Sequence, residues 1–186
     1  MLSDGCLQRR GNSNARFLFA QSGKDNKREY FNLVFSLCIP FMTPTAIALG
    51  AVVKEFVHTT TGAIYSKVSI STMGLPCFTA LHTLFYLNGT KVVPSNIAEL
   101  LTPCGLAHWI MGDGSKHNKG LHLSVYAFST ADVKLLVAAL TAMGLTVTIH
   151  SHVSGPRIYV HEASMPHLRS LVVPYMVPSM YYKVSL

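Results

Sequence analysis

The chain has 186 residues, of which 49% are hydrophobic and only 12% are charged, and this composition excludes an intrinsically disordered protein. Lysine and arginine outnumber aspartate and glutamate by 15 to 8, and the net charge of +7 favours a polyanionic partner, nucleic acid before a membrane surface. The four cysteines show no Cys-x-x-Cys spacing, so zinc-ribbon sites are not expected and the thiols are predicted to be free.

The first half of the chain alternates between strand and helix patterns. Residues 15–21 carry phenylalanine at Phe17 and Phe19, which is the period of a half-buried strand. The charge-free segment 30–53 is interrupted by Pro40 and Pro44, so it is interpreted as helix, loop and strand rather than as a membrane span. The expected elements are strands over 6–10 and 15–21, a helix over 22–37, strands over 47–58 and 63–71, and a helix over 75–87.

The second half repeats this order and begins with a helix. Thr102 and Pro103 have the residue types of a helix N-cap and of a first helical position, and Asp113-Gly114 ends the helix. Ser129 and Asp132 have the spacing of a capping box. The expected elements are a helix over 103–112, strands over 115–117 and 121–128, a helix over 132–143, strands over 145–153 and 157–161, and a helix over 165–173.

Two sequence echoes indicate a diverged tandem repeat. The opening Met1-Leu-Ser-Asp4-Gly resembles Met111-Gly-Asp113-Gly, and residues 68–81 align without gaps on residues 158–171. The first half is longer than the second, and the additional residues are expected within the segment 41–62.

The repeat predicts the fold class and the domains. We expect an α+β protein made of two α-β-β-α-β-β-α units that are related by a pseudo-two-fold axis, with the first helix cut short. The predicted repeats cover residues 1–87 and 103–186, and residues 88–102 are predicted to link them.

Asp113 is predicted at the C-terminal end of its helix, where the helix dipole is negative and a carboxylate is unfavourable. A carboxylate in such a position usually has a counter-charge, and a divalent cation is the first candidate because hard cations prefer oxygen ligands. An ordinary Asp-Gly turn is the alternative interpretation of this stretch by itself. The echo around Asp4 favours the metal site, because a pseudo-two-fold would place one acid from each half at the repeat interface.

Long hydrogen-bond donors recur on the predicted hairpins of both halves. A two-stranded ribbon fits the major groove of DNA, where arginine reads guanine and glutamine or asparagine reads adenine. Arg16 and Gln21 are expected to share the polar surface of the first hairpin, and a solvated strand face is the alternative for any single residue. The residues predicted to contact DNA are Arg9, Arg10, Arg16, Lys54, Lys67, Lys116, Asn118, Lys119, His122, His150, His152 and Arg157.

The segment Leu106-Ala-His-Trp-Ile-Met-Gly-Asp113-Gly resembles the helix that gives its name to the LAGLIDADG homing endonucleases, in their single-chain, two-motif form. The resemblance covers nearly the whole chain as an ordered series of segments. These segments are Ala15-Arg-Phe-Leu-Phe-Ala-Gln21-Ser, residues 65–72, Leu75-Pro-Cys-Phe, residues 88–97, Arg157-Ile-Tyr and residues 174–183. The family implies two saddle-shaped antiparallel sheets that grip a long double-stranded DNA site, in a monomer with an internal pseudo-two-fold.

The resemblance also implies the chemistry. Acids at the ends of both motifs, here Asp4 and Asp113, would hold Mg²⁺ or Mn²⁺, and one DNA strand would be cut for each acid. In the family a glutamine and a basic residue beside each acid order the attacking water, and Gln21 and Lys91 match these positions in the first half. In the second half Tyr126 stands where the glutamine belongs. Lys183 lies in a matching segment, but it is not a convincing equivalent of Lys91.

The first motif departs from the family pattern. Only Met1-Leu-Ser precede Asp4, where about ten helical residues, or roughly 15 Å of helix, are expected. The leading hypothesis is a sequence-specific, metal-dependent DNA endonuclease that is encoded in a mitochondrial intron. The alternatives are a non-cleaving maturase that binds the host intron RNA, and an inactive truncated remnant.

Overall fold

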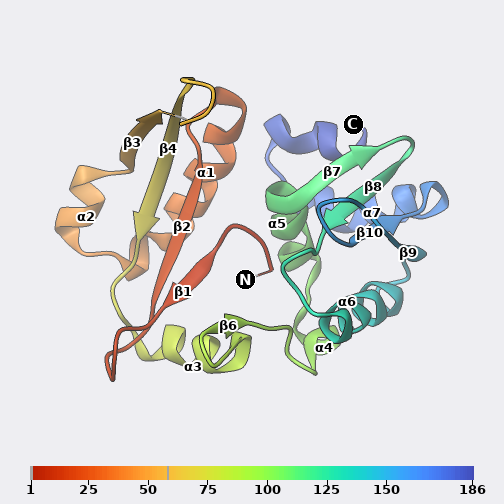
Figure 1. The fold of residues 1–186 in the computed structure, drawn as a ribbon, viewed down its shortest axis with the longest axis horizontal. Helices are drawn as coiled ribbons and strands as arrows, with labels where there is room; N and C mark the ends of the chain where they lie inside the picture. Colours follow the sequence, from red (N-terminus) through yellow and green to blue (C-terminus); the bar gives the residue numbers. More distant parts are fainter. Residues whose placement is uncertain (1, 58) are drawn as a thin grey trace. The chain divides into compact units, whose positions relative to one another are not determined.

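The structure is a computed structural model that describes residues 2–57 and 59–186 (Figure 1). Met1 of the first echo and His58, the last residue of a predicted strand, lie outside the described residues. The chain divides into two compact units, which consist mainly of residues 3–83 and 84–186. Among the described residues, no helix combines the length and the apolar character that a membrane span requires.

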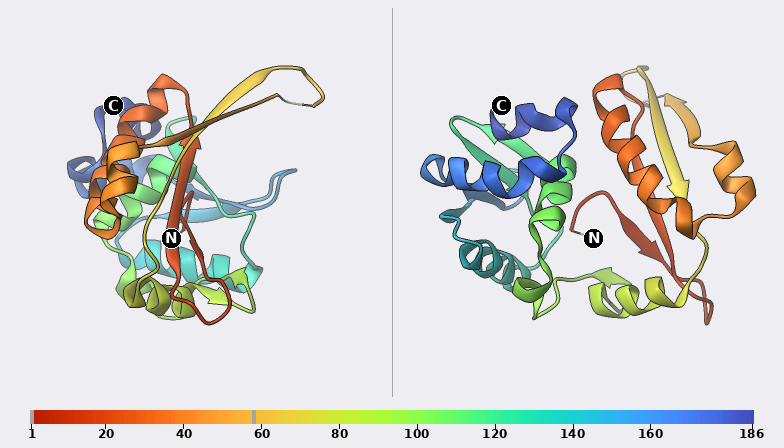
Figure 2. Two further views of the ribbon diagram at one scale, coloured as in Figure 1. Left: turned by 90° about the vertical axis from the view of Figure 1, so that its left-hand side faces the viewer. Right: turned by 180° about the vertical axis from the view of Figure 1, so that it is seen from behind.

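The first unit is built around a four-stranded antiparallel sheet with the strand order β1-β2-β4-β3. Phe19 on this sheet packs against Tyr30 with the ring centroids 5.5 Å apart, and both side chains are buried. The long β3–β4 hairpin extends beyond the rest of the unit (Figure 2). The elements are β1 (Cys6–Gln8), β2 (Arg16–Ser22), α1 (Asp25–Cys38), η1 (Ile39–Phe41), α2 (Pro44–Leu49), β3 (Val52–Val57), β4 (Ile64–Ser71) and α3 (Pro76–Phe85).

The strand predicted from Ile47 is wrong in its first part, because Pro44–Leu49 form the helix α2 and β3 begins only at Val52. The cause is a local cap. Thr43 Oγ1 accepts a hydrogen bond from Ala46 N at 3.2 Å, and Pro44 occupies the first helical position. The helix α2 lies within the segment in which additional residues are expected, and the second unit has only a short connection at this point.

The second unit contains a four-stranded antiparallel sheet with the corresponding order, β7-β8-β10-β9. In both sheets a helix, α1 or α6, follows the second strand along the chain, and the first unit adds α2 before its third strand, which agrees with a diverged tandem repeat. The predicted α+β fold with two antiparallel sheets is confirmed. The elements are β5 (Tyr86–Leu87), β6 (Thr90–Lys91), α4 (Ile97–Leu100), α5 (Pro103–Asp113), β7 (Gly114–His117), β8 (Gly120–Ser124), α6 (Thr130–Ala142), β9 (Val147–His150), β10 (Arg157–Val160), η2 (Glu162–Ser164), α7 (Met165–Val172), η3 (Val173–Tyr175) and η4 (Pro178–Val184).

The capping box predicted at the start of α6 is confirmed, and it has an additional partner. Ser129 Oγ accepts from Asp132 N at 3.1 Å, and Asp132 Oδ2 accepts from Ser129 N at 3.2 Å. The other carboxylate oxygen, Asp132 Oδ1, accepts from Val93 N at 3.0 Å. This last bond ties the segment 88–102, for which a linker is predicted, to α6, and α4 of the same segment also packs against α6.

We expect Asp132→Ala to lower the free energy of unfolding of the second unit by about 2 kcal/mol, because it removes the cap of α6 and leaves the Val93 N–H without its acceptor. Trp109 is the only tryptophan of the chain and is buried in α5, so its fluorescence during urea denaturation reports the unfolding of this unit. The matched control is Lys134→Ala, an exposed position on the same helix. Equal stability of the two variants would contradict the role assigned to Asp132.

Candidate acidic centres and nucleic-acid interface

The helix α5 delivers Asp113 to the start of the second sheet. Thr102 Oγ1 accepts from Gly105 N at 3.1 Å, so the N-cap predicted for this helix is confirmed. Most of α5 is buried against β8, α7 and η4, and its hydrophobic side chains fix the position of its C-terminal end. Gly114 follows directly. A Cβ atom at Gly114 would lie 2.6 Å from the carbonyl oxygen of Ile110, so this position requires glycine.

The C-terminal end of α5 is bound by a buried lysine. Lys183 Nζ donates hydrogen bonds to the carbonyl oxygens of Ile110, Met111 and Gly112 at 3.0, 2.7 and 3.0 Å. The Lys183 side chain, from η4, is only 3% exposed. The last carbonyl groups of a helix form the negative end of its dipole, and most lack an intrahelical donor, although Ile110 O also accepts from Gly114 N. The ammonium group supplies both a donor and a positive charge at this end.

This contact removes one reason to expect a metal ion at Asp113. The protein itself supplies a positive charge at the helix end where Asp113 lies, so the helix dipole alone no longer requires a cation there. The Asp113 carboxylate is still of the ligand type that a hard cation prefers, whereas the neighbouring carbonyl oxygens of Ile110, Met111 and Gly112 already accept from Lys183. Within residues 2–57 and 59–186, no three His, Cys, Asp or Glu side chains gather as a metal-binding group.

Asp4 in the first unit has a different neighbour. Gln21 Nε2 donates a hydrogen bond to Asp4 Oδ2, and the Gln21 side chain is 8% exposed. Successive residues of β2 alternate between the two faces of the sheet, so Gln21 lies on the face of buried Phe19 and not on the face of Arg16. The expectation that Arg16 and Gln21 share one surface is therefore wrong. Their separation of five positions puts them on opposite faces.

Asp4 also lines a hollow on the first sheet together with two of the predicted DNA contacts. Lys54 on β3 lies directly opposite Lys67 on β4, and both are exposed. The hollow has a volume of about 380 Å³ and is bordered by Asp4, Lys54, Lys67 and the strand residues Ala20 and Ser69. The structure thus brings one predicted catalytic acid and two positively charged lysine side chains to the same part of the first unit.

The arginines of the β1–β2 hairpin lie at or near its turn, whereas Asp4 precedes the first strand. Arg9 and Arg10 are exposed in the loop after β1, and Arg9 Nε donates to Ser13 O at 3.0 Å. Arg16 donates from Nε and Nη2 to Gln8 Oε1, at 3.1 and 2.6 Å, across the β1–β2 pair. The Arg16 side chain is therefore held against the neighbouring strand.

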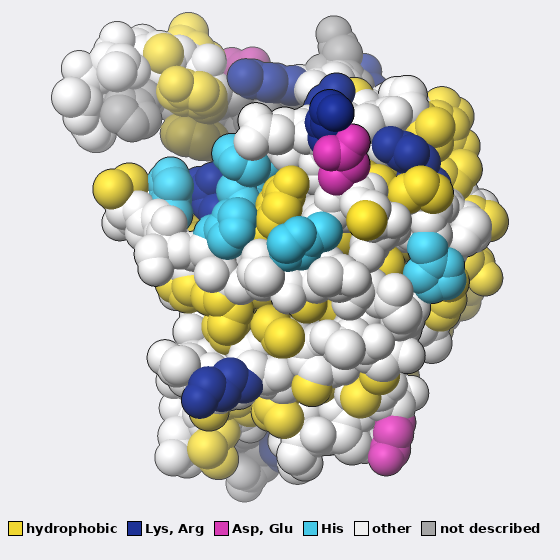
Figure 3. All heavy atoms as spheres, turned by 90° about the vertical axis from the view of Figure 1, so that its right-hand side faces the viewer, with side chains coloured by type: hydrophobic (Ala, Val, Ile, Leu, Met, Phe, Trp, Pro, Cys, Tyr) yellow, Lys and Arg dark blue, Asp and Glu magenta, His cyan; other side chains and the backbone are white. Residues whose placement is uncertain are grey.

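The second sheet has one apolar face and one outward face. Leu121, Leu123, Ile158 and Val160 are buried on the helix side. The alternate positions carry the predicted contacts His122, His150 and Arg157 on the outward face, together with His117 and Tyr159. The space-filling view shows histidine side chains gathered around a hydrophobic side chain (Figure 3).

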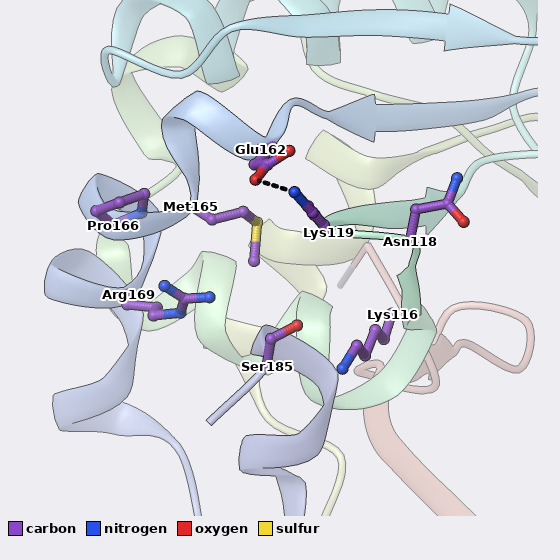
Figure 4. A pocket seen from close by; sticks show the side chains of 8 residues that line it. All are labelled: Lys116, Asn118, Lys119, Glu162, Met165, Pro166, Arg169 and Ser185. Carbon is purple, nitrogen blue, oxygen red and sulfur yellow. Dashed lines mark ion pairs between the residues drawn. The ribbon is translucent and has the colours of Figure 1, made fainter.

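The lysines of the β7–β8 hairpin lie on another surface. Lys116 is the strand partner of buried Leu121, so it lies on the helix side of the sheet and not with His122. Lys119 Nζ makes an ion pair with Glu162 Oε1 at 3.3 Å, and both side chains are well exposed. The structure brings three of the four predicted contacts of this hairpin, all except His122, to one hollow of about 340 Å³ (Figure 4), which is lined by Lys116, Asn118, Lys119, Glu162, Met165, Pro166, Arg169 and Ser185.

Two strand registers give different counterparts of Gln21 in the second sheet. Gln21 lies opposite Val68, which aligns with Ile158, and Ile158 lies opposite Leu123. Cys6 and Ser115, each two positions after its acid, lie opposite Leu18 and His122, and this register matches Gln21 with Val125 instead. Tyr126 is the next residue, in the exposed turn after β8, so its equivalence to Gln21 stays a prediction.

The two candidate lysines have different surroundings. Lys91 lies opposite Tyr86 in the small β5–β6 ribbon of the second unit, so its predicted association with Asp4 stays a prediction. Lys183, which the sequence does not identify as a convincing equivalent of Lys91, binds the end of the helix that carries Asp113. A signal was present, because Lys183-Val184 follows α7 as Lys91-Val92 follows α3.

Comparisons with known proteins agree with this geometry. The sequence model of the LAGLIDADG DNA endonuclease family matches residues 1–168. The cytochrome b mRNA maturase bI2 of Debaryomyces hansenii is 32% identical over 189 aligned positions, which cover 100% of this chain and 70% of the relative. The intron-encoded endonuclease ai4 of Dictyostelium discoideum is 33% identical over 126 positions, which cover 66% of this chain and 79% of the relative.

Solved structures show the same fold. The homing endonuclease I-WcaI bound to its DNA recognition sequence has a TM-score of 0.86 and 22% identity, and the match covers 98% of this chain and 81% of that one. I-DmoI in complex with DNA and manganese has a TM-score of 0.52 and 11% identity, over 93% of this chain and 90% of that one. The predicted resemblance is confirmed by these matches: the chain belongs to the LAGLIDADG DNA endonuclease family.

Proposed function

We propose that the protein is a sequence-specific endonuclease that hydrolyses both strands of a double-stranded DNA site at an intron insertion point. The observation that carries the proposal is the presence of one acid at the start of each four-stranded sheet, with Asp4 just before β1 and Asp113 just before β7. Membership of a DNA endonuclease family and relatives that are named intron-encoded endonucleases support it. The relative that is named a cytochrome b mRNA maturase supports a mitochondrial location.

Asp4 and Asp113 would hold Mg²⁺ or Mn²⁺ together with phosphate oxygens. When bound, such ions supply an activated water and neutralise the charge of the scissile phosphate. The protein's own side chains hold the two acids in position. Gln21 orients the Asp4 carboxylate through its amide, and Lys183 fixes the helix end that carries Asp113. These side chains come from different elements in the two halves, so we expect the two acids to differ in their contribution to the rate.

We assign DNA contact first to the outward faces of the two sheets. Replacing Arg157 by glutamine should reduce the salt dependence of DNA binding. The slope of the logarithm of the binding constant against the logarithm of the salt concentration should become less steep by about one unit, because one phosphate contact and its released counterion are lost. Arg157 is half-buried on the outward face between Ser124 and His150, where it has no carboxylate opposite it in the strand register. Fluorescence anisotropy with a labelled duplex at several salt concentrations measures the slope.

The control for this experiment is Lys134→Gln, which removes an exposed charge from α6 on the helix side of the same sheet. Its slope should equal that of the parent protein. Equal slopes for the parent and Arg157→Gln would show that the outward face of the second sheet does not contact phosphates.

A second candidate function is that of a maturase that binds intron RNA without cutting DNA. The maturase of Debaryomyces hansenii that matches the whole chain favours it. A mobility-shift competition separates the two functions, with a duplex that spans the joined exons competing against the intron RNA. The endonuclease proposal predicts preference for the duplex, and preference for the RNA would favour the maturase.

A further inference from the structure

Four of the nine histidines of the chain make ring contacts with Tyr159 on the outward side of the second sheet. We call this surface the histidine face. Its rings are in direct contact: His117 stacks on His122 at a centroid distance of 4.0 Å, and His150 stacks on Tyr159 at 4.8 Å. The histidine face consists of Tyr159 with His117, His122, His150 and His161 in contact with it, and of His152, which is near enough to His122 to lower its pKa.

Ring nitrogen atoms of the histidine face lie within hydrogen-bond distance of each other or of a common threonine hydroxyl. His122 Nε2 and His150 Nδ1 lie 3.2 Å apart, so one donates and the other must accept, and an accepting nitrogen carries no proton. Thr148 Oγ1 lies 3.2 Å from His150 Nε2 and 3.1 Å from His161 Nε2. His122 is 5% exposed, and its Nδ1 is buried without a hydrogen-bond partner among the described residues. This arrangement suits uncharged rings.

The charged and titratable groups that face His122 are all basic or neutral. They are His117 on β7, His150 and His152 on and after β9, and Arg157 and Tyr159 on β10. Burial first, and then the neighbouring His117, His150, Arg157 and His152, lower the pKa of His122 to about 4. His122 is therefore neutral at pH 7, and within the described part of the chain no carboxylate is among the groups that shift its pKa. An added proton would find its counter-charge in a bound anion.

We propose that the histidine face contacts the sugar–phosphate backbone of the bound nucleic acid and takes up protons as it binds. This inference rests on the proposed function and makes part of its interface specific. Phosphates favour the charged form of a nearby imidazole, and histidine as a residue type titrates close enough to neutral pH for such a shift to matter. Since the complex holds more protons than the free partners, the affinity must rise as the pH falls.

The test uses the full chain, a fluorescein-labelled duplex of mixed sequence and a chelator that prevents cleavage. Between pH 7.5 and pH 6.0 at constant ionic strength, the dissociation constant should fall about tenfold, which corresponds to an average net uptake of roughly 0.7 proton. The double variant His150→Gln, His152→Gln should lose most of this dependence, and both positions are exposed, so the fold is not at risk. The matched control is His167→Gln, on α7 at the helix side, which should keep it.

A second measurement locates the protons. NMR titration of the imidazole Hε1 signals should show that duplex binding raises the pKa of His122 from its low value in the free protein. Trp109 fluorescence at both pH values checks that the protein stays folded. An affinity that does not change with pH, or one whose pH dependence survives in the double variant, would overturn the inference. Absence of duplex binding at both pH values would instead overturn the proposed function on which it rests.

Discussion

Replacing Asp113 by asparagine should abolish metal-dependent cleavage, with a loss on the order of 10³-fold in rate or more. Asparagine has the same shape as aspartate but lacks the negative charge that attracts a hard cation. The helix that carries Asp113 should be unaffected, because its end is held by Lys183 and by the buried side chains of α5. The rate is measured as the conversion of a linear duplex that contains the target site.

Two further measurements make this result interpretable. Glu162→Gln also removes one carboxylate from the second unit, but Glu162 is exposed and pairs with Lys119, so cleavage should continue at the parent rate. Terbium luminescence, excited through Trp109 one helical turn before Asp113, reports cation binding independently of activity. Normal cleavage by Asp113→Asn would show that Asp113 holds no essential metal ion.

Replacing Lys183 by methionine should destabilise the second unit by about 3 kcal/mol, because three carbonyl groups at the end of α5 lose a charge-assisted hydrogen bond in a buried place. Methionine keeps the apolar stem of the side chain, so the loss isolates the ammonium group. Urea denaturation followed by Trp109 fluorescence measures the change, and Lys134→Met provides an exposed lysine for comparison. An unchanged denaturation midpoint would mean that the helix end does not depend on Lys183.

The elements that carry local signals could be predicted from the sequence. Thr102 and Pro103 start α5, and Ser129 and Asp132 start α6, because each cap is formed by residues three or four positions apart. The same kind of signal at Thr43-Pro44 indicates α2, although the apolar run that follows it favours a strand. A cap of this kind decides the local conformation even when the following residues suit a strand.

The parts of the candidate site that depend on long-range contacts could not be predicted. Lys183 reaches Ile110 across 73 positions of the chain, and nothing local indicates that contact. The face on which Lys116 lies depends on its pairing with Leu121, and a shift of one residue in register would move it to the other face. The counterpart of Gln21 depends on the pairing of two strands with their neighbours, and only the structure supplies that register.

The two acids therefore stand in unlike surroundings although the two sheets have the same strand order. Asp4 accepts a hydrogen bond from the amide of Gln21. In the second unit a basic group, Lys183, binds the end of the helix that carries Asp113. A diverged tandem repeat can keep the same strand order while different side chains support the carboxylate in each half.

DNA cleavage that depends on a divalent metal ion can be measured on a duplex that spans the intron-less insertion site of the host gene, with Mg²⁺ and with a chelator in its place. Both strands should be cut at one site in Mg²⁺, and the chelator should prevent the cut. An uncut duplex in Mg²⁺, together with tight binding of the intron RNA, would contradict this expectation and identify the protein as a splicing cofactor.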